Sequence, residues 1–176
     1  MAHLKEQVIL VDSFDSEIGV EEKLVAHQQG LLHRAFSIIL YRLYNDSIQI
    51  LIQKRNINKY HSGGLWSNTC CSHPRPGENI FEAAHRRLAE ELNIKCNQLS
   101  LFDKIYYQYE FENGLSEHEL DYILIGYWDE LLPTPNYNEV ETLQWVDFES
   151  LKKDLKNQPH QYTAWLNNIF EKITFD

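Results

Sequence analysis

The chain has 176 residues, of which 43% are hydrophobic and 24% are charged, and its formal net charge is −10. A chain of this length and composition can bury one sizeable core, so we expect a single globular domain over residues 1–176. The acidic balance argues against a broad basic surface of the kind that binds nucleic acid or an anionic membrane. It does not exclude a small anionic ligand, because binding such a ligand needs only a few cationic side chains close together.

The cysteines and the apolar runs indicate a compartment. No apolar run is long enough to span a bilayer, and the N-terminal residues carry no secretory signal pattern. Three cysteines are an odd number, and Cys70 and Cys71 are neighbours in sequence. This is no disulfide framework, so we expect a reducing cytoplasm and no membrane partner. None of these features indicates an oligomeric state.

Runs of β-forming residues between turn signals predict six strands. They are expected at residues 8–11, 35–44, 48–55, 101–111, 117–128 and 142–146. Two polar turns, Asn45-Asp46-Ser47 and Asn113-Gly114, join neighbouring strands into two hairpins. Loops are expected over residues 56–68 and 70–77.

Helices are expected at residues 20–26, 80–92, 149–156 and 162–173. The second is the best defined, because Asn79 and Glu82 form a capping-box pattern before it. Apolar residues at spacings of three and four give this helix one face for the core. Asn93 is suited to end it in the left-handed conformation.

The densest group of reactive side chains lies within residues 65–94. It comprises Cys71, His73, Arg86, Arg87, Glu90 and Glu91. Cys71 has two interpretations: a small buried hydrophobe, which is the commoner fate of a free cysteine, or a group that carries a proton in catalysis.

Three histidines and two glutamates are candidates for a divalent-metal site: His27, His33, His73, Glu117 and Glu119. In a strand, Glu117 and Glu119 point the same way and repel each other unless a cation or a proton lies between them. The set suits Zn²⁺, Mn²⁺ or Mg²⁺ with five or six ligands. The alternative is that the histidines are ordinary core or surface residues and the glutamates face solvent, since spacing alone does not join the three segments.

The candidate phosphate-binding cations are Lys23, Arg55, Lys59 and Arg87. Arginine gives bidentate contacts to phosphate oxygens, and lysine gives a point charge. Glu91 lies one turn beyond Arg87, and a carboxylate there can bridge through Mg²⁺ to phosphates. The alternative is an ordinary ion pair on a helix surface, worth about 0.3 kcal/mol.

The segments GLLHRAFS, WSNTCCSHP, RRLAEEL and SEHELDYIL resemble the type I isopentenyl-diphosphate isomerases, a branch of the Nudix superfamily. The resemblance covers the chain from about residue 23 to residue 165. It implies an α/β (α+β) fold of the Nudix type, with the Nudix helix and C-terminal helices packed around mixed β-sheets. It also implies the interconversion of isopentenyl and dimethylallyl diphosphate in isoprenoid biosynthesis, by metal-assisted protonation and deprotonation.

The chain departs from the Nudix box at three positions: Ser72 replaces the first glycine, Arg87 a glutamate and Asn93 the last glycine. Nudix hydrolases use that glutamate in a metal-binding cluster that activates water against a diphosphate. A positive charge there is better suited to holding a diphosphate intact. Gly63-Gly64 also stands where the isomerases often have Pro-Gly.

The resemblance implies two metal positions. The first divalent ion, Zn²⁺, Mn²⁺ or Mg²⁺, would be bound by His27, His33, His73, Glu117 and Glu119. A Mg²⁺ would be held by Glu91, by the diphosphate and by the backbone carbonyl of Cys71.

The resemblance also implies the catalytic groups. Cys71 and Glu119 would be the catalytic pair, with the order of proton donation open, assisted by Tyr107 or by its neighbour Tyr106. Lys23, Arg55, Lys59 and Arg87 would hold the diphosphate, and Trp165 would face the hydrocarbon. Two other functions remain open from the residues: a Nudix hydrolase of a nucleoside diphosphate derivative, and a diphosphate-binding or metal-binding protein without catalysis.

Overall fold

The computed structural model describes residues 6–175; residues 1–5 and 176 of the expected domain lie outside the described residues. The described strands are β1 (Gln7–Val11), β2 (Glu17–Glu22), β3 (His33–Tyr44), β4 (Ser47–Arg55), β5 (Trp66–Ser67), β6 (Cys70–Ser72), β7 (Leu99–Glu110), β8 (Ser116–Tyr127) and β9 (Val140–Asp147). The described helices are α1 (Lys23–Gln29), α2 (Ile80–Leu92), α3 (Phe148–Asn157), the short 3-10 helix η1 (Pro159–Gln161) and α4 (Leu166–Phe170).

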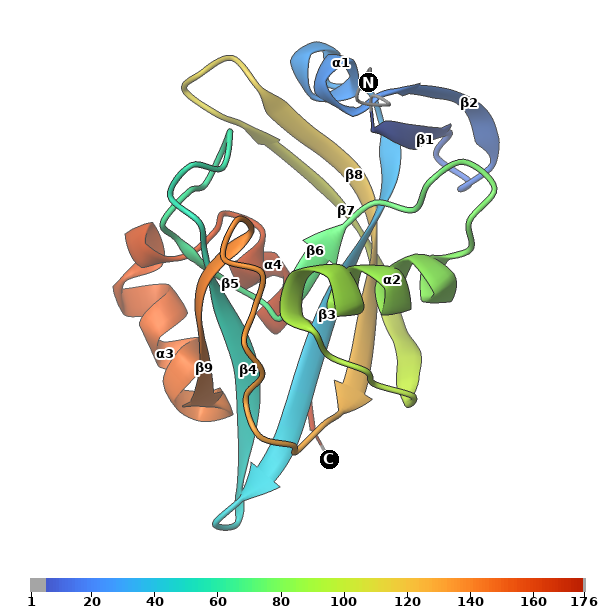
Figure 1. Cartoon of the computed structure of the whole chain (residues 1–176). Coiled ribbons are helices and arrows are strands. Elements are labelled where there is room, and N and C mark those ends of the chain that lie inside the picture. Colours follow the sequence, from blue (N-terminus) through green and yellow to red (C-terminus); the bar gives the residue numbers. More distant parts are fainter. Residues whose placement is uncertain (1–5, 176) are drawn as a thin grey trace.

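Strand β3 lies at the centre of the mixed sheet (Figure 1). It pairs in parallel with β8 and antiparallel with β1, β4 and β6. The parallel register aligns His33 with Glu119, and the antiparallel register aligns Ser37 with Cys71. Because these alignments lie near one end of β3, chemistry-bearing residues from three strands meet there.

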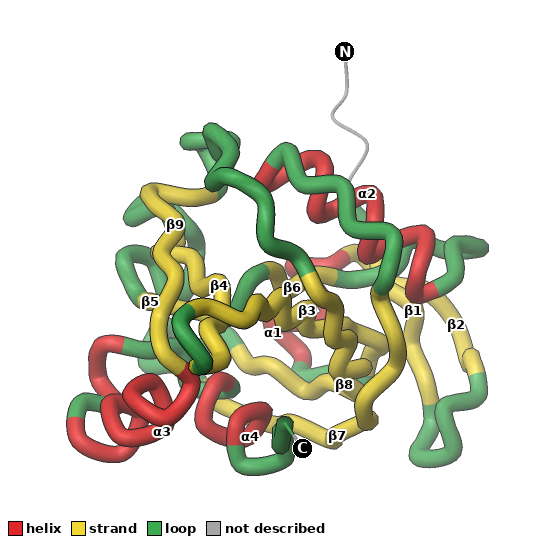
Figure 2. Tube along the Cα trace, turned by 90° about the horizontal axis from the view of Figure 1, so that it is seen from below, coloured by secondary structure: helices red, strands yellow, loops and turns green. Residues whose placement is uncertain are grey.

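The sheet has helices on both faces (Figures 1 and 2). Two clusters of buried hydrophobic side chains lie between the layers. Ile38 and Leu40 of β3 pack in the cluster that contains Leu88 of α2. Ile39, which points the other way, packs in the cluster with Leu151 of α3. A strand buried on both faces is continuously apolar, which explains the run that predicted β3.

Helix α2 is confirmed with its caps. The Asn79 side chain accepts a hydrogen bond from the backbone of Glu82, and the Glu82 side chain accepts one from the backbone of Asn79. Asn93 ends the helix with a φ of 54° in the left-handed region. Because both ends of the helix are fixed by caps, Arg87 and Glu91 have a defined direction, toward the end of the sheet where these strands meet.

Four expectations of local structure were wrong in extent. The helix expected at residues 20–26 begins only at Lys23, because β2 pairs with β1 as far as Glu22. The loop expected over residues 56–68 contains β5, which pairs with β4, and the loop expected over residues 70–77 contains β6, which pairs with β3. The last helix is shorter than expected: Trp165 precedes α4.

Among the described residues, no helix combines the length and the apolarity needed to cross a membrane.

Candidate active site

Cys71 faces the interior from β6 and is held by polar neighbours. Its Sγ donates to Asn68 Oδ1 at 2.8 Å and lies 3.5 Å from the hydroxyl of Ser37. Burial, together with the charge of Asp121, raises the pKa of the Cys71 thiol to about 12. The thiol therefore keeps its proton at neutral pH and is a group that can carry one.

Three imidazoles and a carboxylate converge beside this thiol. One ligand atom from each of His27, His33, His73 and Glu119 lies within 4.8 Å of all the others. Glu119 Oε1 is 2.9 Å from His73 Nε2 and 3.5 Å from His33 Nε2. The four residues come from α1, β3, the segment after β6, and β8, and the parallel register of β3 and β8 aligns His33 with Glu119.

The ring orientations fit a divalent ion. His27 Nδ1 lies 2.7 Å from the carbonyl of Lys23, and His33 Nδ1 lies 2.7 Å from the carbonyl of Leu31. Each Nδ1 therefore carries the proton, and the Nε2 lone pair is left for a metal. His27 Nε2 is buried and has no hydrogen-bond partner among the described residues. Burial lowers the pKa of His73 to about 3, so this ring is also neutral and able to bind metal.

The two glutamates on β8 have different partners. Burial raises the pKa of Glu119, but its contacts with the His33 and His73 rings outweigh this and leave the pKa well below its usual range. Burial and the neighbouring charge of Glu119 raise the pKa of Glu117 well above its usual range. Glu117 does not join the group of four in the structure: it groups with His27 and His61.

His61 was missed in the sequence. It is 7% exposed and its Nε2 lies 3.4 Å from Glu117 Oε1. Its position two residues after Lys59 in a long loop was the only available signal, and nothing in the spacing links that loop to β8.

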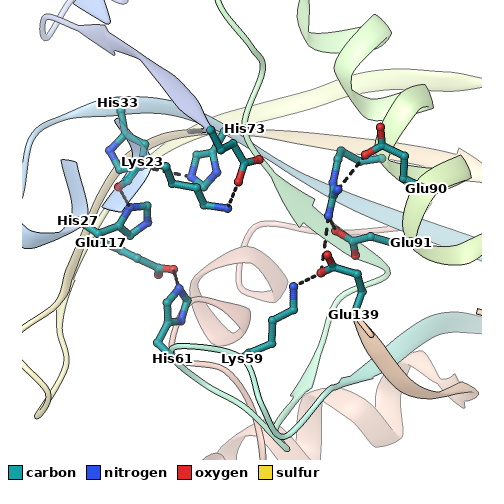
Figure 3. A network of polar contacts seen from close by, with 12 residues as sticks. Lys23, His27, His33, Lys59, His61, His73, Glu90, Glu91, Glu117 and Glu139 are labelled. Atoms are coloured by element: carbon teal, nitrogen blue, oxygen red, sulfur yellow. Dashed lines mark hydrogen bonds and ion pairs between the residues drawn. The ribbon is translucent and has the colours of Figure 1, made fainter. Parts of the chain in front are cut away.

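The four candidate phosphate-binding cations, Lys23, Arg55, Lys59 and Arg87, all line one cavity, which Cys71, Glu119 and Trp165 also line. Within the described residues each lysine has a carboxylate partner: Lys23 pairs with Glu6 at 3.0 Å and Lys59 pairs with Glu139. Figure 3 shows Glu139 and Glu91 on the side of the network away from the histidines, with Lys59 beside His61 and directed at Glu139.

Arg87 and Glu91 form the other end of the cavity. Arg87 donates to Glu91, to Glu90 at 2.8 Å, and lies 3.8 Å from Glu139. Glu91 is 5% exposed and also accepts from Gln53 at 3.3 Å. Glu139 and Gln53 were not predicted as site residues, because each acts only as a partner of a predicted one.

Of the aromatic candidates, Trp165 lines the cavity, and the ring of Tyr107 lies beside it with the ring centres 6.5 Å apart. Trp165 is 5% exposed, donates from Nε1 to Asn68 Oδ1 at 3.2 Å, and has the guanidinium of Arg55 5.5 Å from its ring centre. Tyr107 is buried opposite Glu119 in the β7–β8 register, and its hydroxyl has no partner among the described residues. Tyr106 is 56% exposed and its hydroxyl donates to a backbone carbonyl remote from the cavity.

Comparison with known proteins identifies the family. The NUDIX domain family matches residues 31–166. An isopentenyl-diphosphate Delta-isomerase of Aromatoleum aromaticum is 46% identical over 97% of this chain and 93% of its own length. One from Burkholderia multivorans is 43% identical over 96% and 93%. The crystal structure of DR0079 from Deinococcus radiodurans shares the fold, with a TM-score of 0.70, 21% identity, and coverage of 94% of this chain and 98% of that one. The chain therefore belongs to the Nudix family and, within it, to the isopentenyl-diphosphate Delta-isomerases.

Proposed function

We propose that this protein interconverts isopentenyl diphosphate and dimethylallyl diphosphate, with Cys71 and Glu119 as the two proton-transferring groups. The observation that carries the proposal is that a thiol from β6 and a carboxylate from β8 line the same cavity, which also has four cations and a tryptophan in its wall. The full-length relatives with this activity in their names support it.

The reaction needs two proton transfers at carbon. A proton is added to the terminal carbon of the alkene, which leaves a tertiary carbocation, and a proton is then lost from the neighbouring methylene. One of Cys71 and Glu119 supplies the first proton, and the other accepts the second. The two groups belong to different strands, so the substrate can lie between them, with an acid on one side and a base on the other.

The carbocation must be stabilised and kept from water. The face of Trp165 suits this, because a ring quadrupole attracts a cation without bonding to it. Tyr107, buried beside Glu117 and Glu119, is the assisting tyrosine in this proposal; its burial and the two carboxylates raise its pKa, so its hydroxyl stays neutral and can donate a hydrogen bond.

A divalent ion fits the group of His27, His33, His73 and Glu119, with Glu117 as a further ligand after a change of side-chain position. The donor set of imidazole and carboxylate suits Zn²⁺, Mn²⁺ or Mg²⁺. Such an ion supplies positive charge that polarises the Glu119 carboxyl. The chain's own contribution is to fix the ring tautomers through the carbonyls of Lys23 and Leu31.

At the other end we propose that Lys23, Arg55, Lys59 and Arg87 hold the diphosphate. Glu91 would hold a Mg²⁺ together with the diphosphate oxygens and the Cys71 carbonyl. The cations now paired with Glu91 and Glu139 would exchange part of those contacts for phosphate oxygens. We further propose that residues 1–176 act as one catalytic domain on this small molecule in the cytoplasm, without nucleic acid or membrane as a partner.

The test is incubation of the purified protein with isopentenyl diphosphate and Mg²⁺, Mn²⁺ or Zn²⁺, followed by separation of the products. Dimethylallyl diphosphate is expected, and its absence with every metal contradicts the proposal. Release of phosphate from a panel of nucleoside diphosphate derivatives, without isomer, would favour the hydrolase function instead. Arg87 at the glutamate position of the Nudix box makes that outcome unexpected.

A further inference from the structure

Asn68 lies in the two-residue connection between β5 and β6 and is fully buried. Strands β3 and β4 pair only next to their hairpin, from Tyr41 with Ile50 to Tyr44 with Ser47. Beyond that point the side chains of the connection make hydrogen bonds to backbone groups of both strands. The sheet therefore sets the position of Asn68.

The amide group of Asn68 has one orientation that its neighbours allow. Its Nδ2 lies 3.1 Å from the carbonyl oxygen of Ile38 and 3.0 Å from that of Cys70. Carbonyl oxygens only accept hydrogen bonds, so the NH₂ group must face them and Oδ1 must face the other way. The nitrogen side of the amide binds the backbone, and the oxygen side is left for side chains.

Three side-chain donors share the Asn68 oxygen. The Cys71 thiol donates to Oδ1 at 2.8 Å, the Ser67 hydroxyl at 3.0 Å and the Trp165 indole N–H at 3.2 Å. An amide oxygen has two lone pairs, so the three hydrogen bonds compete. Cys71 and Trp165 both line the substrate cavity, and one buried atom joins them.

We propose that Asn68 is a positioning residue for proton transfer, whose single oxygen holds the Cys71 thiol and the Trp165 ring in one fixed arrangement. This role rests on the proposed isomerase function. When the thiol turns from Oδ1 to the substrate carbon, the Ser67 hydroxyl and the indole N–H still donate to Oδ1. No buried acceptor is then left without a donor, so the thiol is both held in place and released at little cost.

Thr69, the next residue, provides a matched control. Its hydroxyl is equally buried, donates to the carbonyl of Leu51 at 2.6 Å and accepts from the backbone N–H of Leu40 at 2.9 Å. These bonds reach only the backbone of β3 and β4. Thr69→Val therefore removes buried hydrogen bonds from the same connection but leaves the three donors of Asn68 in place.

The first test compares the steady-state kinetics of Asn68→Ala and Thr69→Val. Asn68→Ala is expected to lower kcat about 100-fold, because displacing a reacting group by about 1 Å costs this much. KM should change less than about threefold, because none of the described hydrogen bonds of Asn68 reaches a diphosphate-binding cation. Thr69→Val should lower Tm but change kcat less than about threefold. A folded Asn68→Ala protein with unchanged kcat, or an equal loss of kcat in both variants, overturns the proposal.

The second test needs no substrate and leaves Asn68 in place. Raman spectroscopy records the S–H stretching band of Cys71, which is identified by its absence in Cys71→Ser. Ser67→Ala and Trp165→Phe each remove one competing donor, so the bond from the thiol to Oδ1 should strengthen and the band should move to lower frequency. Thr69→Val should not move it.

A band that stays in place in either donor variant overturns the proposal, and these spectra decide it if Asn68→Ala does not fold. Because they are recorded without turnover, they also separate the two hypotheses. Absence of isomerase activity contradicts the proposed function, whereas an unmoved band contradicts the arrangement around Asn68.

Discussion

Replacing Arg87 by alanine tests the residue that separates this site from the hydrolase box. Arg87 lines the cavity at its diphosphate end, and its side chain is 15% exposed. A hydrogen bond to a charged group contributes about 1.5–3 kcal/mol. At about 1.4 kcal/mol per factor of ten, Arg87→Ala should raise KM for isopentenyl diphosphate about 10- to 150-fold. The diphosphate does not react, so it is bound equally in the ground and transition states, and kcat should change less than about threefold.

The same substitution affects stability, because Glu91 loses its arginine partner and is left with neutral neighbours such as Gln53 at 3.3 Å. Leaving a buried carboxylate without its cation costs about 3 kcal/mol, which lowers Tm by about 6–12 °C for a chain of this size. Steady-state assays are therefore run well below that temperature, with circular dichroism as a check on folding. Arg87→Lys should lose about three- to tenfold in KM, and Arg75→Ala, an exposed control, nothing. A loss confined to kcat, or an equal loss in the control, would refute this reasoning.

Three further substitutions test other parts of the site. Cys71→Ser should lower kcat by at least about 100-fold with little change in Tm, since a serine hydroxyl can also donate to Asn68; turnover at the unchanged rate removes Cys71 from the mechanism. Tyr107→Phe should lower kcat about tenfold and Tyr106→Phe should not; the reverse result would assign the assisting role to the exposed tyrosine. Asp121 has its pKa raised to about 8 by burial and by the charge of Glu119, so the folded chain holds a proton that the unfolded chain releases near its ordinary pKa of 3.8. This proton adds to the free energy of unfolding at low pH, and the addition is lost as pH rises through 8. Asparagine does not titrate, so between pH 5 and pH 8 the free energy of unfolding of Asp121→Asn should rise by about 3 kcal/mol relative to that of the unchanged protein. Urea unfolding with a chelator at the two pH values checks this, and an unchanged difference contradicts it.

Most of the secondary structure could be predicted from signals between residues close together in the sequence. The capping box at Asn79 and Glu82 and the left-handed Asn93 use contacts within a few residues, so the sequence located helix α2 correctly. The helix expected at residues 20–26 was misplaced, because the pairing of Glu22 with Gln7 is a tertiary contact that overrides helical propensity. Strand β6 was missed for the same reason: three residues beside β3 carry no periodicity of their own.

The site residues also divide into those that the sequence predicted and those that only tertiary contacts reveal. His33 and Glu119 are brought together by the parallel β3–β8 register, which spacing alone does not reveal and which only the family resemblance implied. His61 and Glu139 come from loops or strand ends, and each is recognisable only through a partner across the cavity. Residues matching a known motif were therefore predictable, whereas those acting through tertiary partners were not.

The central claim is that Cys71 and Glu119 add a proton to the terminal carbon of the alkene and remove one from the methylene next to the double bond, while the diphosphate stays intact. The most direct measurement is an NMR spectrum of isopentenyl diphosphate incubated with the protein and a divalent metal in deuterated water. We expect dimethylallyl diphosphate with deuterium in a methyl group, no free phosphate, and no deuterium incorporation with Cys71→Ser. Release of phosphate without isomer, or recovery of substrate free of deuterium, would contradict the account.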